Sequence, residues 1–246
     1  MDRMQLEHRT LDAAGGAPPF ALAVLRPKAA SSAILLLPAI AGIDSYIAQR
    51  AAHLAAEGYA VAVLDYYRGS GHKPDLSTPQ RIDEAVAALD DQGVMRDIGL
   101  ALQWLRDQGF GAASTGLVGV CIGGAFALIA SAGDAAAACT VAYYGQLRSP
   151  GKPLGPIAVA PRIRMPALVH IGERDRLISA ADVADFRAAA RDSAAAIEVH
   201  TYPGAPHAFD EWHRSAVFRP VASAEAWRRT LNFLHWHLKQ TPRSIA

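Results

Sequence analysis

The chain has 246 residues, a formal net charge of +1 and two cysteines, and 51% of its residues are hydrophobic. This length predicts a single domain over residues 1–246 with a sizeable core. The Lys and Arg residues form no basic stripe, so we expect neither a nucleic-acid partner nor a membrane partner. Two cysteines are too few for a secreted disulfide framework and indicate a reducing compartment.

The first segments of the chain predict a location and a sheet. Residues 1–8 carry acidic side chains and lack an apolar stretch of the kind found in secretory signals, so we expect a cytoplasmic protein. Continuous apolar runs at 33–37 and 60–64 are typical of strands that are buried on both faces. A helix is expected to begin near Asp44, between the two runs.

A cysteine between glycines marks the centre of the chain. Residues 115–119 predict a buried strand and residues 125–130 predict a helix, with Gly-Val-Cys-Ile-Gly-Gly between them. A sharp strand-to-helix turn would hold Cys121 in a strained conformation beside the free N–H groups of the new helix. Those features favour a thiolate nucleophile. A small buried thiol in a Gly/Ala-rich core is the alternative for this motif alone.

A carboxylate and an imidazole follow two later strands. Residues 167–171 predict a buried strand that is followed closely by Asp175, and residues 197–202 predict a strand that leads into a Pro/Gly-rich loop containing His207. Taken singly, these are a loop acid and a loop histidine. Together with Cys121 they give the chain order nucleophile, acid, histidine, which is the order used by α/β-hydrolases.

The remaining pattern predicts an α/β fold. Strands alternate with helical stretches, which indicates a mainly parallel sheet with helices on both faces. Apolar residues recur at helical spacing in two stretches, and both are expected to face the core: Val94, Ile98, Leu102 and Leu105, and Trp227, Leu231, Leu234 and Leu238. Residues 146–166 are rich in Pro and Gly and predict a loop that borders the pocket.

The other histidines and the second cysteine predict structural roles. His235 and His237 would point in different directions on a helix, and His170 and His200 lie within predicted strands. The sequence therefore indicates no metal site and no cofactor. Cys139 is expected to be a packed core thiol.

Three motifs together resemble one family. Gly-Val-Cys-Ile-Gly-Gly, Gly-Glu-Arg-Asp and Pro-His-Ala-Phe are similar to motifs of the dienelactone hydrolase family, which has the α/β-hydrolase fold. The resemblance spans most of the chain and includes Tyr-Tyr-Gly at 143–145. It implies that Cys121 is the nucleophile, Asp175 the acid and His207 the base.

Two positions depart from the family pattern. Ala39 stands where well-known members have a glutamate that takes part in switching the cysteine to its thiolate. Glu211 stands where those members have an arginine that binds a substrate carboxylate. Tyr67 and Arg68 are the remaining candidates for substrate binding. We therefore expect neutral esters to be better substrates than carboxylate-bearing ones.

The expected reaction is acyl transfer to sulfur followed by hydrolysis of a small ester or lactone. His207 would take the thiol proton and later activate water, and Asp175 would hold its tautomer. The backbone N–H groups of Ile122 and Ile40 would bind the oxyanion.

Two other functions remain as alternatives at this point. Class I glutamine amidotransferases also place a cysteine in a glycine-flanked elbow, but they usually carry a His-x-Glu pair, which His-Ala-Phe at 207–209 lacks. A noncatalytic binding module on the same fold is the second alternative. The sequence gives no indication of the oligomeric state.

Overall fold

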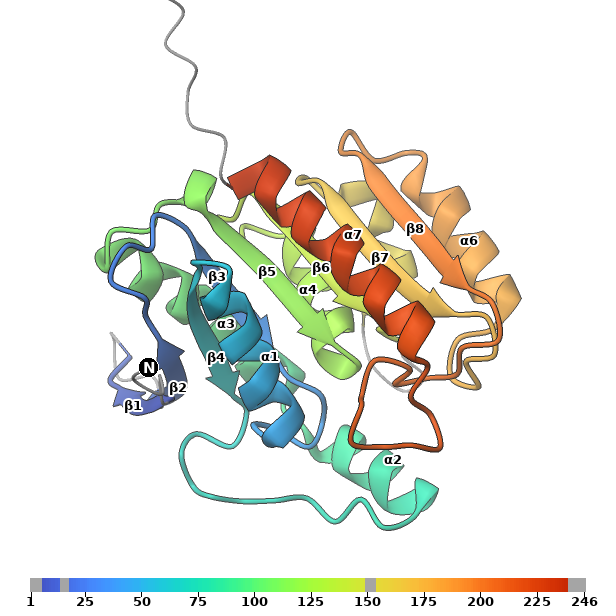
Figure 1. The fold of residues 1–246 in the computed structure, drawn as a ribbon, viewed down its shortest axis with the longest axis horizontal. Coiled ribbons are helices and arrows are strands. Elements are labelled where there is room, and N and C mark those ends of the chain that lie inside the picture. The colour runs from blue at the N-terminus through green and yellow to red at the C-terminus, as the bar shows by residue number, and fades with distance from the viewer. Residues whose placement is uncertain (1–5, 14–17, 149–153, 239–246) are drawn as a thin grey trace, which may run out of the picture.

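The computed structural model describes residues 6–13, 18–148 and 154–238. An eight-stranded sheet runs through its centre in the order β1-β2-β4-β3-β5-β6-β7-β8 (Figure 1). The strands are β1 (Glu7–Leu11), β2 (Phe20–Leu25), β3 (Ala33–Leu37), β4 (Ala60–Asp65), β5 (Thr115–Val120), β6 (Cys139–Tyr143), β7 (Ala167–Gly172) and β8 (Ile197–Tyr202).

Most neighbouring strands are parallel. The six strands from β3 to β8 run in one direction, with pairs such as Leu37 opposite Gly119 and Val120 opposite Tyr143. β1 and β2 are antiparallel additions at one edge, where β2 pairs with β4. The mainly parallel sheet predicted from the sequence is therefore confirmed. The antiparallel pair was not foreseen.

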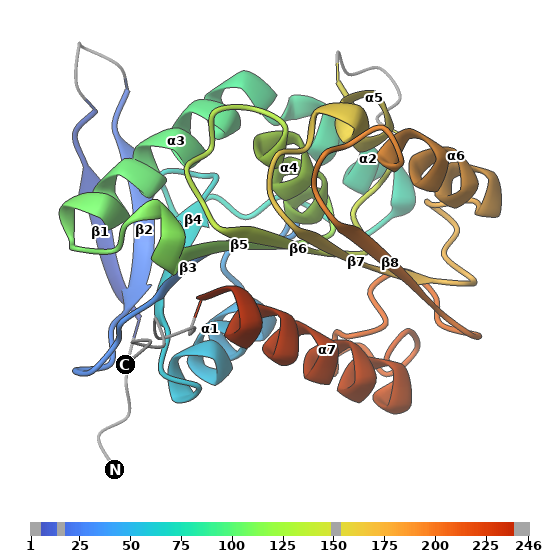
Figure 2. The ribbon, with the colours of Figure 1, turned by 90° about the horizontal axis from the view of Figure 1, so that it is seen from above.

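Helices cover both faces of the sheet. Figure 2 shows α1 and α7 on one face and α2 to α6 on the other. Their bounds are α1 (Ser45–Ala56), α2 (Pro79–Ala88), α3 (Asp91–Asp107), α4 (Ile122–Ser131), α5 (Pro156–Val159), α6 (Ala180–Ala190) and α7 (Pro220–Leu238). The predicted helix near Asp44 is α1, and the Asp44 carboxylate caps it by accepting the Ile47 N–H at 2.9 Å.

The apolar runs form the core. All residues of β3, β5, β6 and β7 are buried, as expected for strands covered on both faces. The α3 stripe that begins at Val94 is fully buried, as predicted. The α7 stripe is confirmed in part, because Leu234 and Leu238 are buried and Trp227 packs half-buried against the core, whereas Leu231 is only half-buried. Ala226, Thr230 and Phe233 complete the buried face of α7.

The predicted loop at 146–166 contains short helical turns where it is described. α5 is followed directly by a 3₁₀ turn at Ala160–Arg162. Pro156 opens α5, where its missing N–H has no helical partner to lose. Residues 149–153 of the predicted loop lie outside the described residues.

The parallel topology places the predicted site residues at one edge of the sheet. Cys121 directly follows β5, Asp175 follows β7, and His207 lies in the connection after β8. Ile40 follows β3 and Tyr67 follows β4. Because the carboxyl ends of parallel strands meet at one edge, groups more than 160 residues apart in sequence come together there.

Candidate active site

Cys121 occupies a strained turn between β5 and α4. Its φ is 55° and its ψ is −123°, a region that residues with a side chain rarely adopt. The turn brings Gly123 so close to β3 that an added Cβ would lie 2.2 Å from the Leu37 carbonyl oxygen. Only glycine permits this approach. The predicted strained elbow is therefore present, with α4 beginning immediately after Cys121.

A second close approach joins the segments that carry Asp175 and His207. A Cβ on Gly172 would lie 2.3 Å from the Ala205 carbonyl oxygen, so the end of β7 packs directly on the loop after β8. The Arg174 N–H donates to that same carbonyl at 2.9 Å. This backbone contact places Asp175 beside His207.

The three predicted groups form a continuous chain of polar contacts. His207 Nε2 lies 3.3 Å from the Cys121 sulfur, and His207 Nδ1 lies 2.8 Å from Asp175 Oδ2. An ionised carboxylate only accepts, so Nδ1 carries a proton and Nε2 faces the sulfur. The second carboxylate oxygen of Asp175 accepts the Leu177 N–H at 2.8 Å. The carboxylate is thus held from both sides.

The surroundings of His207 favour its protonated form. Burial lowers the pKa of His207, but the negative charge at Cys121 and the hydrogen bond to Asp175 outweigh burial and raise the pKa to about 10. Asp175 is fully buried, whereas 19% of the His207 side chain is exposed. The arrangement can therefore hold a proton on the imidazole next to a negatively charged sulfur.

The expected oxyanion-binding groups flank the elbow. Ile122 is the first residue of α4, so its N–H has no partner within the helix. On the other side, the Tyr67 hydroxyl donates to the Ile40 carbonyl at 2.6 Å, and the Tyr66 hydroxyl donates to the Pro38 carbonyl at 3.0 Å. Two neighbouring tyrosines after β4 thus fix the loop that carries Ile40.

Sequence reasoning missed the part that Tyr66 plays, and it named Tyr67 for substrate binding rather than for loop support. The Tyr67 side chain is half-buried, and its ring packs so close to Gly42 that a Cβ added there would lie 3.1 Å from the ring. An aromatic pair directly after a strand end, Asp65-Tyr66-Tyr67, was the available signal. Contact between Tyr67 and a substrate stays a prediction.

The structure does not bring Arg68 to the three central groups. Its guanidinium forms an ion pair with Asp97 of α3 at 2.9 Å and donates to the Pro19 carbonyl at 3.3 Å. Among the described contacts of Arg68, none reaches Cys121 or His207. Substrate binding by Arg68 stays a prediction that requires the guanidinium to leave Asp97.

Glu211 is buried and paired. It is 7% exposed, and its carboxylate accepts a hydrogen bond from Arg214 at 3.0 Å. Burial raises the pKa of Glu211, while the hydrogen bond and charge of Arg214 oppose the rise. The acidic group therefore lies in the same loop as His207 with a partly compensated charge.

His170 and Cys139 have packing roles in the core. His170 is fully buried, with Tyr202 at 2.8 Å and Thr230 at 3.0 Å, and burial lowers its pKa well below the usual value. Burial raises the pKa of the Cys139 thiol to about 12. These contacts confirm structural roles for His170 and Cys139.

Two general properties bear on what the site could bind. Nowhere in the described ranges do three or more His, Cys, Asp or Glu side chains gather as a metal site requires. No described helix combines the length and the apolar character that are needed to cross a membrane.

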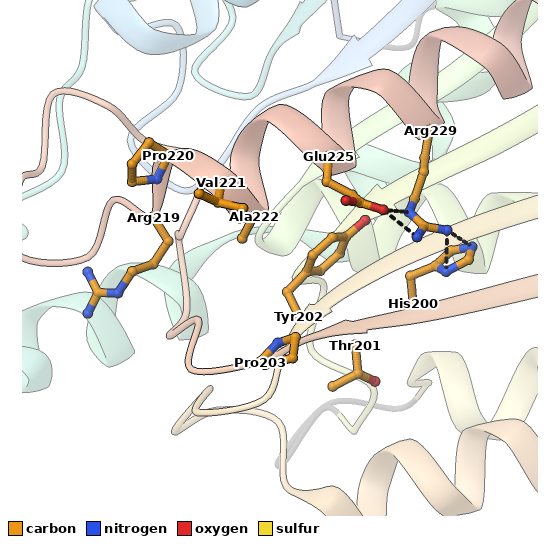
Figure 3. A pocket seen from close by; sticks show the side chains of 10 residues that line it. All are labelled: His200, Thr201, Tyr202, Pro203, Arg219, Pro220, Val221, Ala222, Glu225 and Arg229. Carbon is orange, nitrogen blue, oxygen red and sulfur yellow. Dashed lines mark hydrogen bonds and ion pairs between the residues drawn. The ribbon is translucent and has the colours of Figure 1, made fainter.

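A surface cavity elsewhere on the described chain does not include this site. It has a volume of about 520 Å³ and lies between β8 and the start of α7 (Figure 3). Arg229 lines the cavity, and its guanidinium donates to Glu225 at 2.5 Å and to His200 at 2.9 Å. Cys121 and His207 do not line this cavity. The residue types at the elbow, rather than hollow volume, therefore mark the candidate active site.

Comparison with known proteins gives consistent matches. The model of the dienelactone hydrolase family matches residues 20–238. A Bradyrhizobium sp protein named "probable 2-oxo-3-(5-oxofuran-2-ylidene)propanoate lactonase" is 36% identical over 211 residues, which cover 84% of each protein. The carboxymethylenebutenolidase of Pseudomonas putida is 29% identical over 221 residues, covering 84% of this chain and 86% of that protein. A solved Klebsiella pneumoniae structure is 24% identical with a TM-score of 0.81, and it covers 96% of this chain and 99% of that one.

The sheet order, the helices on both faces and the strained strand-to-helix turn at Cys121 define an α/β-hydrolase fold, in agreement with the structural match. The chain belongs to the dienelactone hydrolase family, and it is a hydrolase of carboxylic esters or lactones. These matches support neither the amidotransferase alternative nor the noncatalytic binding module.

Proposed function

We propose that this hydrolase cleaves a small ester or lactone through an acyl-cysteine intermediate, with Cys121 as nucleophile, His207 as base and acid, and Asp175 as the group that orients His207. The observation that carries the proposal is the unbroken contact from the Cys121 sulfur through both ring nitrogens of His207 to the buried Asp175 carboxylate. A nucleophile, a base and an orienting group within hydrogen-bond reach are what covalent acyl transfer requires.

The first half-reaction forms a carbon–sulfur bond. The sulfur of Cys121 attacks the carbonyl carbon of the ester, and the carbonyl electron pair moves onto oxygen. The N–H groups of Ile122 and Ile40 would donate to that oxyanion. As the tetrahedral intermediate collapses, the bond to the alcohol oxygen breaks and the His207 imidazolium gives its proton to that oxygen.

The second half-reaction restores the negatively charged sulfur of Cys121 and the imidazolium of His207. Neutral His207 takes a proton from a water molecule, whose oxygen attacks the acyl carbon, and the carbon–sulfur bond then breaks. The products are a carboxylic acid and the free sulfur of Cys121, so atoms and charges balance. In a lactone the alcohol stays attached to the acyl group, and one hydroxy acid results.

The fixed loop at Ile40 supports the oxyanion assignment. Because the Tyr67 hydroxyl holds the Ile40 carbonyl at 2.6 Å, the loop is set before a substrate arrives. Donors that are fixed in advance stabilise developing charge without reorganisation during the reaction. Ile40 and Ile122 would act through their backbone N–H groups, so the identity of their side chains matters little to this role.

The substrate class is expected to resemble that of the related lactonase and carboxymethylenebutenolidase in being a small ester or lactone. Ala39 and Glu211 make a neutral acyl group the better fit, because neither residue offers a positive charge to a substrate carboxylate. We place the reaction in the cytoplasm, since two cysteines are too few for the disulfide framework of a secreted protein.

Cys121→Ala tests this function with a panel of small esters, lactones and thioesters. We expect hydrolysis to be lost while circular dichroism shows a native fold, because one sulfur atom is removed from a half-buried position. Cys139→Ala is the matched control, since it removes the buried thiol outside the site and should keep turnover. Undiminished turnover by folded Cys121→Ala would contradict the nucleophile assignment.

A further inference from the structure

The mechanism leaves one buried ionic cluster unused. Asp210 lies three residues after His207 and is completely buried. Its carboxylate accepts hydrogen bonds from the Tyr46 hydroxyl at 2.5 Å, from the Ser223 hydroxyl at 2.6 Å and from the Arg50 guanidinium. These donors come from α1 and α7, so a single carboxylate joins the His207 loop to two helices.

Contacts of this cluster lead from Asp210 through Tyr46 and Tyr144 to His207. The Tyr46 hydroxyl lies 3.4 Å from the hydroxyl of Tyr144, and the Tyr144 ring packs edge-on against the His207 ring at 5.1 Å. From His207 the backbone leads through two residues back to Asp210. The imidazole is therefore held by Asp175 at Nδ1, while Tyr144 of this cluster packs against the imidazole ring.

The same cluster reaches the other parts of the site. Tyr46 and Arg50 lie on α1, the helix that follows the Ile40 loop. Tyr144 follows β6, next to the Tyr143 carbonyl that accepts the Cys121 N–H at 2.9 Å. Base, oxyanion loop and nucleophile elbow thus each have a short connection to Asp210.

Stability alone explains this cluster poorly. Burying an ion pair removes two charges from water, and well-packed apolar residues of similar volume are often as stabilising or more so. Arg50 is 5% exposed and is surrounded by rings, with its guanidinium 4.4 Å from the Trp227 ring centroid. Its Nε atom has no hydrogen-bond partner among the described residues. A directional, fully buried carboxylate is instead suited to fixing the geometry of a loop.

We propose that Asp210, through Arg50 and Tyr46, is a positioning residue that holds His207 in register with Cys121. This inference rests on the proposed function. Asp210 touches neither the substrate nor the reacting sulfur, and it acts by limiting where the His207 loop lies. Small displacements of a catalytic group lower the rate of reaction steeply, so loss of this anchor should reduce kcat more than it changes KM.

The test replaces the whole ion pair, because removal of one partner would leave a buried charge and unfold the protein. Arg50→Met combined with Asp210→Leu should keep the circular dichroism of the native chain. We expect kcat to fall roughly tenfold or more, with KM changed less than about twofold. We also expect the pH profile of Cys121 alkylation by iodoacetamide to change, because the imidazole no longer keeps its place beside the sulfur. A folded double variant with native kcat and a native alkylation profile would overturn the proposal.

Single hydroxyl deletions keep the test decisive if the double variant does not fold. Tyr46→Phe and Ser223→Ala each remove one hydroxyl that donates to Asp210. Ser32→Ala is the control. It removes a buried hydroxyl next to the amino end of β3, which donates to the Leu238 carbonyl at 2.9 Å. We expect the first two to lower kcat and alter the alkylation profile, and Ser32→Ala to change neither. Equal behaviour of all three would overturn the positioning role.

Alkylation separates this proposal from the proposed function, since it requires Cys121 and His207 but no substrate turnover. Turnover by Cys121→Ala would refute the acyl-cysteine mechanism. The alkylation profiles would still show whether Asp210 holds His207 beside the sulfur.

Discussion

His207 Nε2 lies 3.3 Å from the Cys121 sulfur, so a charge on the sulfur acts directly on the imidazole. A negatively charged sulfur stabilises the imidazolium of His207. We therefore expect the pKa of His207 to depend on whether the Cys121 sulfur is present.

Removal of the sulfur should lower the pKa of His207. In the native protein, Cys121 and Asp175 outweigh burial and raise that pKa to about 10. In Cys121→Ala the contribution of the sulfur disappears, so His207 should lose its proton at lower pH. NMR titration of the His207 ring in both proteins measures the change. An unchanged titration would show that the sulfur carries no charge next to the ring.

Asp175→Asn should lower turnover more than substrate binding. The amide keeps the shape of the carboxylate but removes the charge that holds the proton on Nδ1 and stabilises the imidazolium. We expect kcat to fall by about 10²–10⁴-fold with little change in KM.

Glu173→Gln provides the matched control for Asp175→Asn. The Glu173 carboxylate accepts the Gly204 N–H at 2.8 Å rather than a bond from His207. Its replacement should therefore leave kcat near the native value. The opposite ranking, with Glu173→Gln inactive and Asp175→Asn active, would mean that Glu173 is the functional acid.

The sequence allowed much of this site to be predicted because each group follows a recognisable strand pattern. β3, β5 and β7 are apolar runs, β8 alternates apolar and polar residues, and parallel strands place their carboxyl ends at one edge. The glycines on both sides of Cys121 predict a sharp turn, and the φ of 55° at Cys121 confirms it. Local chemistry was sufficient for these features.

Partners distant in sequence could not be predicted in the same way. β1 is mostly exposed and has no apolar run, so only its pairing with β2 identifies it as a strand. Arg68 was a candidate for substrate binding, but Asp97, 29 residues away, holds its guanidinium. The role of Asp210 could not be predicted from the sequence, because its partners Tyr46 and Arg50 lie more than 150 residues earlier. Tertiary packing alone determines these contacts.

Removal of the Glu211 charge should improve the use of anionic substrates. Compared with a neutral ester of the same size, a carboxylate-bearing ester should have the lower kcat/KM in the native enzyme. Glu211→Gln should raise kcat/KM for the anionic ester by up to about tenfold, which corresponds to about 1.4 kcal/mol, and should leave the neutral ester little changed. Glu225→Gln on α7 is the control, since Glu225 pairs with Arg229.

The same charge predicts a pH dependence. Burial raises the pKa of Glu211, so its carboxyl becomes neutral on acidification at a higher pH than an exposed glutamate does. The preference of the native enzyme for the neutral ester should therefore weaken as pH falls through that pKa, and it should stay constant in Glu211→Gln. A native preference for the anionic ester at neutral pH would show that another cation controls binding.

The most direct test of the mechanism is to trap the acyl-enzyme. The native protein is mixed with an activated ester, quenched in acid within the first turnover and digested for mass spectrometry. The mechanism predicts that the peptide containing Cys121 gains the mass of the acyl group in the native protein, and that the corresponding peptide of Cys121→Ala gains none. Turnover without acylation of Cys121, or an acyl group on another residue that reacts at the rate of turnover, would contradict it.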